Sequence, residues 1–296
     1  MAGDIISIVL LLKDGAPYLD DLIRSLSEQE TSSSIELVVI DSGSTDGGAE
    51  LVERLCERSG IDLRLSSIPP EEFGHGKTRN LAVGIARGEI VAMLSQDALP
   101  DSPQWLESLV RPLGDAGVAG VFGRQVARPE TGLSESLFYE MTYPTQGRRT
   151  GTDTEFSNLS IFFSNVNGAV RRSLALAHPF RDDLVMSEDQ FWGRAVLREG
   201  YDIIYEPRAA VIHSHGYDLR ALFKRYLQSG YSLRQMGLEG EVVRGGVSST
   251  LRLLGRVLRE HPREFPYAVV YQFVQGFAWL SGRYDLLPRS IRERLL

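Results

Sequence analysis

The chain has a single cysteine, Cys56, among its 296 residues. An intrachain disulfide is therefore impossible, and Cys56 is expected to pack as a small hydrophobic side chain of a helix. Long hydrophobic runs are also missing, since no segment is apolar enough over enough residues to cross a bilayer. The apolar run Ile5–Leu12 is short and follows no basic residue, unlike a secretory signal. We expect a cytoplasmic protein, either free or peripheral at the inner face of the plasma membrane.

An excess of positive charge is missing as well, because the net charge is −7. This balance argues against a surface that attracts nucleic acid, and no nucleic-acid partner is expected. The charge is unevenly placed: residues 216–296 hold 13 Lys and Arg against 7 Asp and Glu, and the remainder holds 19 against 32. The acidic body favours metal binding, and the basic C-terminal segment favours an anionic partner. A solvated helical face explains the basic segment equally well.

Strand-like and helix-like segments alternate over the first 113 residues. Strands are predicted at Ile5–Leu12, Ile35–Ile40, Leu63–Ser66 and Ile90–Leu94, and helices at Tyr18–Glu28, Gly48–Ser59, Thr78–Ala86 and Pro103–Leu113. Several of these strands are continuous apolar runs, which is typical of strands buried on both faces. The alternation predicts an α/β fold with a mostly parallel open sheet flanked by helices.

The remainder of the chain has a less regular pattern. We expect loops and a short helix over Pro129–Glu155, and a turn that leads into a helix over Ser164–Arg172. Further predicted elements are a helix at Ser187–Glu199, short strands at Ile203–Tyr205 and Ala209–Ile212, and only helices after Leu219. These patterns predict a catalytic domain over residues 1–235 and a C-terminal helical extension over residues 236–296.

Polar residues follow three of the predicted strands directly, at Lys13-Asp14, Asp41–Asp46 and Ser95-Gln96-Asp97. Ligands of open α/β sheets bind beyond the carboxyl ends of the strands, so these clusters should meet at one crevice. The carboxylate of Asp41 is suited to accept the N3–H of a pyrimidine base. A turn with a helix N-cap is the alternative, and it explains Asp46 better than Asp41.

Two of the polar segments suit a diphosphate and a metal. Lys77 and Arg79 lie at the start of a predicted helix, where unpaired N–H groups favour an anion, and their charges suit a diphosphate. Asp97 ends a strand, and its carboxylate can bind a divalent cation that bridges the diphosphate. The alternatives are ordinary surface cations and a simple transition from strand to turn.

Two later segments carry acids and histidines. Glu188 and Asp189 open a helix, where adjacent carboxylates serve catalysis or only complement the helix dipole. His213 and His215 flank a serine after a strand. A lone histidine is more often structural, but a His-x-His pair at a strand end, in a chain with five histidines, favours a metal site.

Taken in order, these motifs resemble glycosyltransferases of family 2, which have the GT-A fold. The resemblance rests on Ile8–Leu12, Val38–Asp46, His75–Asn80, Leu94–Pro100, Glu188-Asp189 and His213. Phe73–Asn80, Ser95–Pro100 and Ser164–Gly168 further resemble bacterial rhamnosyltransferases that build O-antigen and other surface polysaccharides. The family resemblance covers roughly residues 5–235, and the later helices resemble the rhamnosyltransferase subgroup more loosely.

The resemblance implies a metal-dependent reaction that inverts the anomeric configuration. Asp189 would be the general base, and Glu188 would help to orient the acceptor or the base. Asp97 and His213, with His215 as the second choice, would hold Mg²⁺ or Mn²⁺. This sequence departs from the family at one position. The family's metal motif has two acids, and Ser95 stands here in place of the first of them.

The resemblance also implies a nucleotide-sugar donor. Asp41 would recognise the base, Lys77 and Arg79 would meet the base or the diphosphate, and Gln96 would bind the donor beside Asp97. The subgroup favours deoxythymidine-diphosphate-rhamnose (dTDP-rhamnose), with a uridine-diphosphate sugar as the alternative, and a glycan or lipid-linked acceptor. Candidates for an apolar wall beside the 6-methyl group of rhamnose are Phe162, Phe163, Phe191 and Trp192.

The C-terminal segment has an amphipathic pattern. Arg252, Arg256, Arg259 and Arg263 recur at helical spacing opposite Leu251, Leu254 and Leu258, and Tyr267–Leu280 is rich in aromatic and aliphatic residues. We expect either an interfacial membrane contact or packing on the catalytic domain or in a homodimer.

The sequence also allows two rival functions. A sugar nucleotidyltransferase would need a glycine-rich loop after the first strand, where Lys13–Pro17 stands instead. A non-catalytic nucleotide-sugar-binding scaffold is suggested by Ser95.

Overall fold

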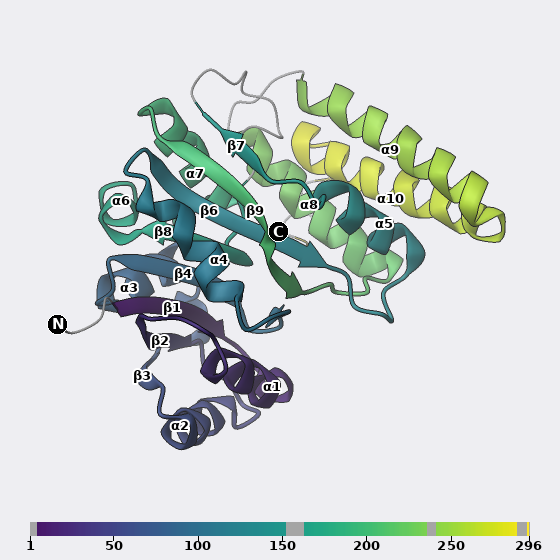
Figure 1. Ribbon diagram of the computed structural model, residues 1–296. Coiled ribbons are helices and arrows are strands. Elements are labelled where there is room, and N and C mark those ends of the chain that lie inside the picture. The colour runs from purple at the N-terminus through teal and green to yellow at the C-terminus, as the bar shows by residue number, and fades with distance from the viewer. Residues whose placement is uncertain (1–4, 152–162, 236–240, 289–294, 296) are drawn as a thin grey trace.

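The computed structural model describes residues 5–151, 163–235, 241–288 and 295 (Figure 1). The strands are β1 (Ile5–Leu12), β2 (Ser34–Asp41), β3 (Asp62–Ser67), β4 (Ile90–Ser95), β5 (Leu99–Pro100), β6 (Val118–Val126), β7 (Arg148–Thr150), β8 (Asn167–Arg171) and β9 (Asp202–Ile212). The helices are α1 (Ala16–Ser27), α2 (Gly48–Ser59), α3 (His75–Ile85), α4 (Trp105–Val110), α5 (Leu133–Thr142), α6 (Arg172–Ala177), α7 (Glu188–Arg198), α8 (Leu219–Gln235), α9 (Glu241–Glu260) and α10 (Phe265–Tyr284). The predicted α/β class is confirmed.

The described strands form one sheet in the order β3-β2-β1-β4-β8-β6-β9-β5, and β7 pairs with β9. The pairs among β3, β2, β1 and β4 are all parallel. Direction changes at β8, which runs antiparallel to both β4 and β6, and β6 and β9 are again parallel. The first half therefore has the predicted parallel arrangement, and the second half is mixed.

The helices cover both faces of the sheet because side chains of a strand alternate between its faces. In β1, Ile8 and Leu10 pack in a core with residues of α1, α2 and α4, such as Leu22, and Cys56 lies in the same core at 1% exposure. Val9 points the other way, into a core with residues of α3, α6 and α7. Continuous apolar strands therefore serve two cores, as expected for strands covered on both faces.

The helix expected within Ser164–Arg172 is a wrong prediction, since this segment contains β8, and the helix α6 begins only at Arg172. Close packing between β4 and β6 overrides the local pattern. The Asn167 side chain donates to the backbone oxygens of Arg124 and Ala209, and it accepts from the Trp105 indole N–H. These bonds hold residue 167 in the sheet.

The three C-terminal helices lie together at one end of the molecule, beyond β9 (Figure 1). α8 and α10 approach closely at two glycines: a Cβ on Gly230 would lie 2.1 Å from the Trp279 oxygen, and one on Gly282 would lie 2.0 Å from the Leu227 oxygen. α9 packs on α5 and α10 through Leu253. A domain boundary at residue 235 stays a prediction, although it divides α8 from its partner α10. Within the described residues, no helix is both long and apolar enough to span a membrane.

We predict that Gly282→Ala destabilises the fold by roughly 1–3 kcal/mol, because the added methyl group meets a backbone oxygen that cannot rotate away. Gly276→Ala on the same helix is the control. Its added Cβ meets no atom within 4 Å, so a gain of about 0.5–1 kcal/mol is expected from helix propensity. Urea unfolding of both variants measures the difference, and equal stabilities would contradict the close packing.

Candidate active site and metal centre

The three polar clusters that follow β1, β2 and β4 meet at one crevice, as predicted. The Lys13 N–H donates to Gln96 Oε1, and Gln96 Nε2 donates back to the Lys13 oxygen, both at 2.9 Å. The Lys13 ammonium also donates to the Gly43 oxygen at 2.6 Å. A cavity beside these contacts is lined by Lys13, Ser42, Arg79, Gln96 and Asp97.

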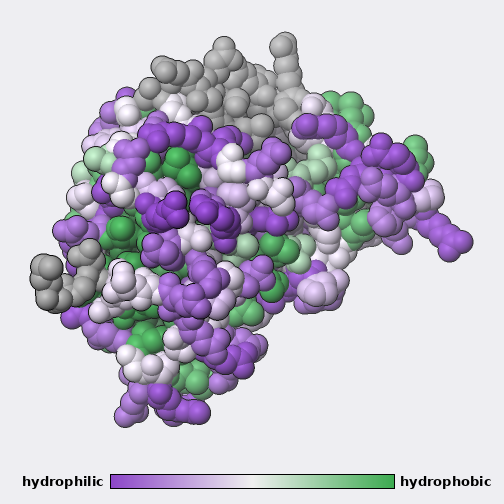
Figure 2. Space-filling view, in the orientation of Figure 1, coloured by the Kyte–Doolittle hydropathy of each residue, from purple (hydrophilic) through white to green (hydrophobic). Residues whose placement is uncertain are grey.

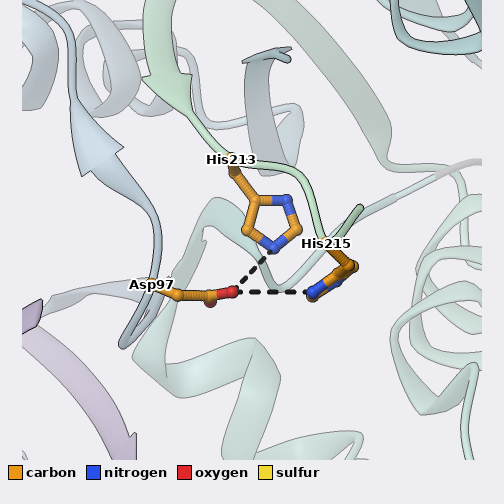
Figure 3. Close-up of side chains that lie close together, drawn as sticks. All are labelled: Asp97, His213 and His215. Atoms are coloured by element: carbon orange, nitrogen blue, oxygen red, sulfur yellow. Dashed lines mark ion pairs between the residues drawn. The ribbon is translucent and has the colours of Figure 1, made fainter. Parts of the chain in front are cut away.

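At one side of this cavity, Asp97 and the two histidines of the His-x-His pair converge (Figure 3). Asp97 Oδ2 lies 3.6 Å from His213 Nε2 and 3.6 Å from His215 Nδ1. The three ligand atoms lie within 4.8 Å of one another. This spacing is too long for a hydrogen bond and slightly wider than the roughly 3.0–3.5 Å between ligands that share one cation at about 2.1 Å, so small side-chain rotations would place the three atoms around a cation. The residues therefore fit a divalent metal.

The protonation of the histidines suits the same purpose. His213 Nδ1 bonds to Gln125 Oε1 at 3.0 Å, so the proton lies on Nδ1 and the lone pair of Nε2 faces Asp97. Burial lowers the pKa of His213 to about 4, and burial also lowers the pKa of His215. Both rings are therefore neutral near pH 7, which is the form that binds a metal.

A buried carboxylate on α5 holds the loop that carries His215. Glu135, 6% exposed, accepts the N–H of His215 at 3.1 Å through one oxygen and the N–H of Tyr217 at 3.3 Å through the other. A carboxylate bonded at both oxygens fixes the backbone on each side of residue 216. Glu135 thus positions His215 without touching Asp97.

The other side of the site contains two carboxylates in different environments. Glu188, 4% exposed, accepts from Arg79 Nη1 at 2.6 Å and from Asn165 Nδ2 at 3.3 Å. Burial alone would raise the pKa of Glu188, but the charge of Arg79, together with His75 and hydrogen bonds that include the one from Asn165, outweighs burial, so this pKa is lowered. Glu188 therefore stays ionised, and its bonded oxygen is turned into the protein.

Asp189 is partly buried, and its Oδ2 accepts the Asn165 N–H at 3.1 Å. Burial and the adjacent charge of Glu188 raise the pKa of Asp189 to about 7. A carboxylate with this pKa can take up a proton near neutral pH, which is the property that a general base needs. Glu188 thus carries a permanent charge, whereas Asp189 can accept a proton.

The segment Phe73–Asn80 lines the cavity and also contacts the segment from Phe180 to Glu188. Besides Arg79, Asn80 bonds twice to the backbone of Phe180, at 2.7 and 2.9 Å. A Cβ on Gly76 would lie 1.9 Å from the Arg181 oxygen, so only glycine fits there. The short-range signal of this motif, cations at a helix start, does not reveal these long-range contacts.

Two further predicted binding residues, Asp41 and Lys77, do not line this cavity. Asp41 is 5% exposed, and its carboxylate accepts the N–H groups of Gly43 and Ser44. Lys77 is exposed and lies 3.8 Å from Glu72. Neither lines the cavity described above, and their roles, like those of the other site residues, stay predictions.

Several site residues had no assigned role in the sequence. His75 lines the cavity, and burial lowers its pKa to about 4. Asn165 bonds to both carboxylates of the Glu188-Asp189 pair, and Arg225 on α8 lies 3.7 Å from Met186, two residues before Glu188. Gln125 and Glu135 support the histidines. The motifs around His75 and Asn165 carried a signal in the sequence, whereas Arg225, Gln125 and Glu135 contact the site only through the tertiary fold.

The expected apolar wall is wrong for two of its residues. Phe163 and Trp192 are 0% and 2% exposed and pack on each other in the core, with ring centroids 5.0 Å apart. Phe191 is partly buried beneath the Arg181 guanidinium, 4.6 Å from its ring. Phe162 lies outside the described residues. Core packing explains Phe163 and Trp192 without a sugar.

Comparison with known proteins gives a consistent picture. Residues 7–176 match the model of glycosyl transferase family 2. The chain is 29% identical to the O-antigen chain rhamnosyltransferase WbaN of Salmonella anatum, over 89% of this chain and 84% of that protein. It is 28% identical to the O-antigen chain rhamnosyltransferase RfbN of Salmonella typhimurium, over 89% of this chain and 85% of that protein.

Solved structures resemble the whole fold. The mannosyltransferase PcManGT of Pyrobaculum calidifontis, in complex with GDP-Man and Mn²⁺, has a TM-score of 0.61 at 21% identity, covering 98% of this chain and 78% of that one. A fragment of TarS from S. aureus, in complex with UDP, has a TM-score of 0.57 at 17% identity, covering 98% and 85%. These likenesses confirm the predicted GT-A fold.

We predict that Mn²⁺ binds at Asp97, His213 and His215, and binds more tightly than Mg²⁺, because imidazole ligands suit Mn²⁺ better than Mg²⁺. His213→Ala and His215→Ala should each weaken Mn²⁺ binding at least tenfold in titration calorimetry. His178→Ala is the matched control, since His178 lies elsewhere beside Glu199 and should leave the affinity unchanged. Equal affinity in all variants would remove the site.

We predict that Asp189→Asn changes the pH dependence of stability. The native state keeps a proton on Asp189 up to about pH 7, whereas the unfolded chain releases it near about pH 3.9. The wild type should therefore lose stability relative to Asp189→Asn as the pH rises from 4 to 8. Asp20→Asn, at an exposed position of α1, should follow the wild type. Parallel curves for wild type and Asp189→Asn in chemical unfolding would contradict the raised pKa.

Proposed function

The chain belongs to glycosyl transferase family 2, and we propose that within it the protein is an inverting, metal-dependent rhamnosyltransferase. It would move rhamnose from dTDP-rhamnose to a glycan or lipid-linked acceptor in surface polysaccharide synthesis, on the cytoplasmic side. One observation carries the catalytic part. A single cavity is bordered by Asp97 of the metal cluster and by Arg79, which holds Glu188 next to Asp189.

Each side of this cavity has a separate task in the proposed reaction. Lys13 and Arg79 place positive charge beside the cavity, where it stabilises the charge that develops on the leaving diphosphate. Asp97, His213 and His215 would hold a divalent metal, Mn²⁺ in our proposal, which supplies further Lewis-acid stabilisation of that charge. Ser95 removes one carboxylate from the usual metal motif, and His215 makes up the ligand number.

Asp189 removes the proton from the attacking acceptor hydroxyl. Its pKa of about 7 suits this task, since it is ionised enough to act and basic enough to accept. The hydroxyl oxygen attacks the anomeric carbon from the face opposite the leaving diphosphate, so a single displacement inverts the configuration. Glu188 is bonded to Arg79 and Asn165. We therefore propose that it orients the base and not the acceptor.

The donor is proposed on the relatives rather than on the cavity. Two rhamnosyltransferases match nearly nine tenths of the chain, and the motifs around Arg79, Asp97 and Asn165 resemble that subgroup. Asp41, at the end of β2, would accept the N3–H of the thymine base, which uracil also offers. The family match favours sugar transfer over nucleotide transfer, and so argues against the nucleotidyltransferase alternative.

The test measures nucleoside diphosphate release with Mn²⁺, a glycan acceptor and either dTDP-rhamnose or uridine-diphosphate hexoses. We expect dTDP release with inverted product configuration by NMR, and a kcat/KM that rises with pH to a plateau above about 7. Asp189→Asn should bind the donor normally but lose roughly 10²–10⁴-fold in kcat.

Each other outcome contradicts a different part of the proposal. A preference for a uridine-diphosphate hexose would remove rhamnose and leave the glycosyltransferase. Normal turnover by Asp189→Asn would remove the base. Pyrophosphate release would indicate a nucleotidyltransferase, and donor binding without turnover would indicate a scaffold.

A further inference from the structure

The helices α8 and α10 contain no aspartate or glutamate, although the chain has 39 acidic residues. α8 carries four cations, and its Arg220 and Lys224 are exposed and form no ion pair with any described residue, while Arg225 reaches Met186 beside the site. Only Arg234 is paired, with Asp285. Among the described residues, this end of the molecule therefore keeps positive charge that no ion pair neutralises, while the chain as a whole is negative.

The same end exposes large apolar side chains. On α10, Tyr267, Val270, Phe273 and Phe277 are 49%, 46%, 70% and 43% exposed, at spacings of three and four residues that place them on one side of the helix. Phe273 and Phe277 stack with ring centroids 6.1 Å apart, and Phe223 of α8 lies 6.2 Å from Phe277. The sequence of α10 has no charged residue before Arg283. Contiguous apolar surface of this kind is typical of an interaction site.

α9 adds a second apolar stripe with cations beside it. Val247, Leu251 and Leu258 are 55%, 65% and 54% exposed, and Arg252 and Arg259 are exposed on the same helix. Figure 2 shows hydrophobic side chains along the edge of the molecule where α9 lies in Figure 1, bordered by hydrophilic ones. The inner sides of α9 and α10 pack on α5 and α8, so these exposed residues are additional to those that hold the fold.

We propose that this outer surface of α8, α9 and α10, hereafter the C-terminal face, docks on the surface of an anionic lipid bilayer. Exposed aromatic and aliphatic side chains would enter the boundary between headgroups and acyl chains, and the unpaired cations would meet the lipid phosphates. No described helix is long and apolar enough to cross the bilayer, which agrees with a helix layer that lies on it. The negative remainder of the chain is repelled by the same surface, so the orientation is fixed.

Charge also favours a bilayer over a second copy of the chain. A symmetric dimer would bring the same patch of both copies together, and Arg220, Lys224 and Arg252 would then face like charges. Anionic lipid offers the opposite sign over an area wide enough for all three helices. This proposal does not depend on the donor, the acceptor or the metal.

The test is flotation of the full chain with vesicles of phosphatidylcholine alone or mixed with phosphatidylglycerol. We expect binding only to the mixed vesicles, and weaker binding at high salt. The double variant Arg220→Gln/Lys224→Gln should bind roughly 30-fold more weakly, because the loss of each cation is expected to weaken binding about fivefold. Phe273→Ser/Phe277→Ser should lose at least tenfold.

The matched control is Leu81→Ser/Leu176→Ser, which removes two apolar residues with 42% and 48% exposure from α3 and α6 at the opposite end of the molecule (Figure 1). It should bind vesicles like the wild type. Unchanged thermal unfolding and Mn²⁺ affinity in each variant show that the fold is intact. Failure of the wild type to float, or equal flotation of all variants, would overturn the proposal. So would a dimer in sedimentation velocity that Phe273→Ser/Phe277→Ser converts to a monomer.

Discussion

The buried ion pair between Arg79 and Glu188 is the constraint on which the site depends. It joins α3 to the start of α7, across 109 residues of sequence, at 2.6 Å. Breaking a buried pair by removing one partner leaves an uncompensated charge, so neither residue is free to move alone. The fixed charge of Glu188 then acts on Asp189 and helps to raise its pKa to about 7. Thus a contact that resembles simple structural support also adjusts the proton affinity of the proposed base.

The metal side is organised by hydrogen bonds to the histidine ring and to the backbone instead. Gln125 from β6 fixes the tautomer of His213, and Glu135 from α5 fixes the loop of His215. Gln125 lies in the half of the sheet that has mixed strand directions, and α5, which carries Glu135, follows β6 in the chain. The parallel half therefore brings the polar clusters to the crevice, whereas the mixed half supplies histidines in the form that binds a metal. A site between them can combine metal ligands with a base of raised pKa.

Charge separates two ends of the molecule. The body holds most of the acidic residues, while α8 and α10 hold none. Glycines at positions 230 and 282 let α8 and α10 pack backbone to backbone, while Lys224 of α8 and Phe273 of α10 stay exposed. Arg225 of α8 contacts Met186, two residues before Glu188, so α8 connects the proposed lipid contact with the proposed catalytic pair.

The sequence by itself determined the elements whose signals are local. Continuous apolar strands, amphipathic helices and polar clusters at strand ends predicted β1, β2, β4 and the crevice where they meet, because the carboxyl ends of parallel strands lie at one edge. The His-x-His pair indicated a metal site, and the family resemblance added Asp97 to it. Only the tertiary structure decided that residues 167–171 form a strand, that Phe163 and Trp192 are core, and that Arg79 meets Glu188. Each of these depends on contacts between residues far apart in the chain, whose free energy of packing and burial exceeds the local preferences that a sequence pattern reports.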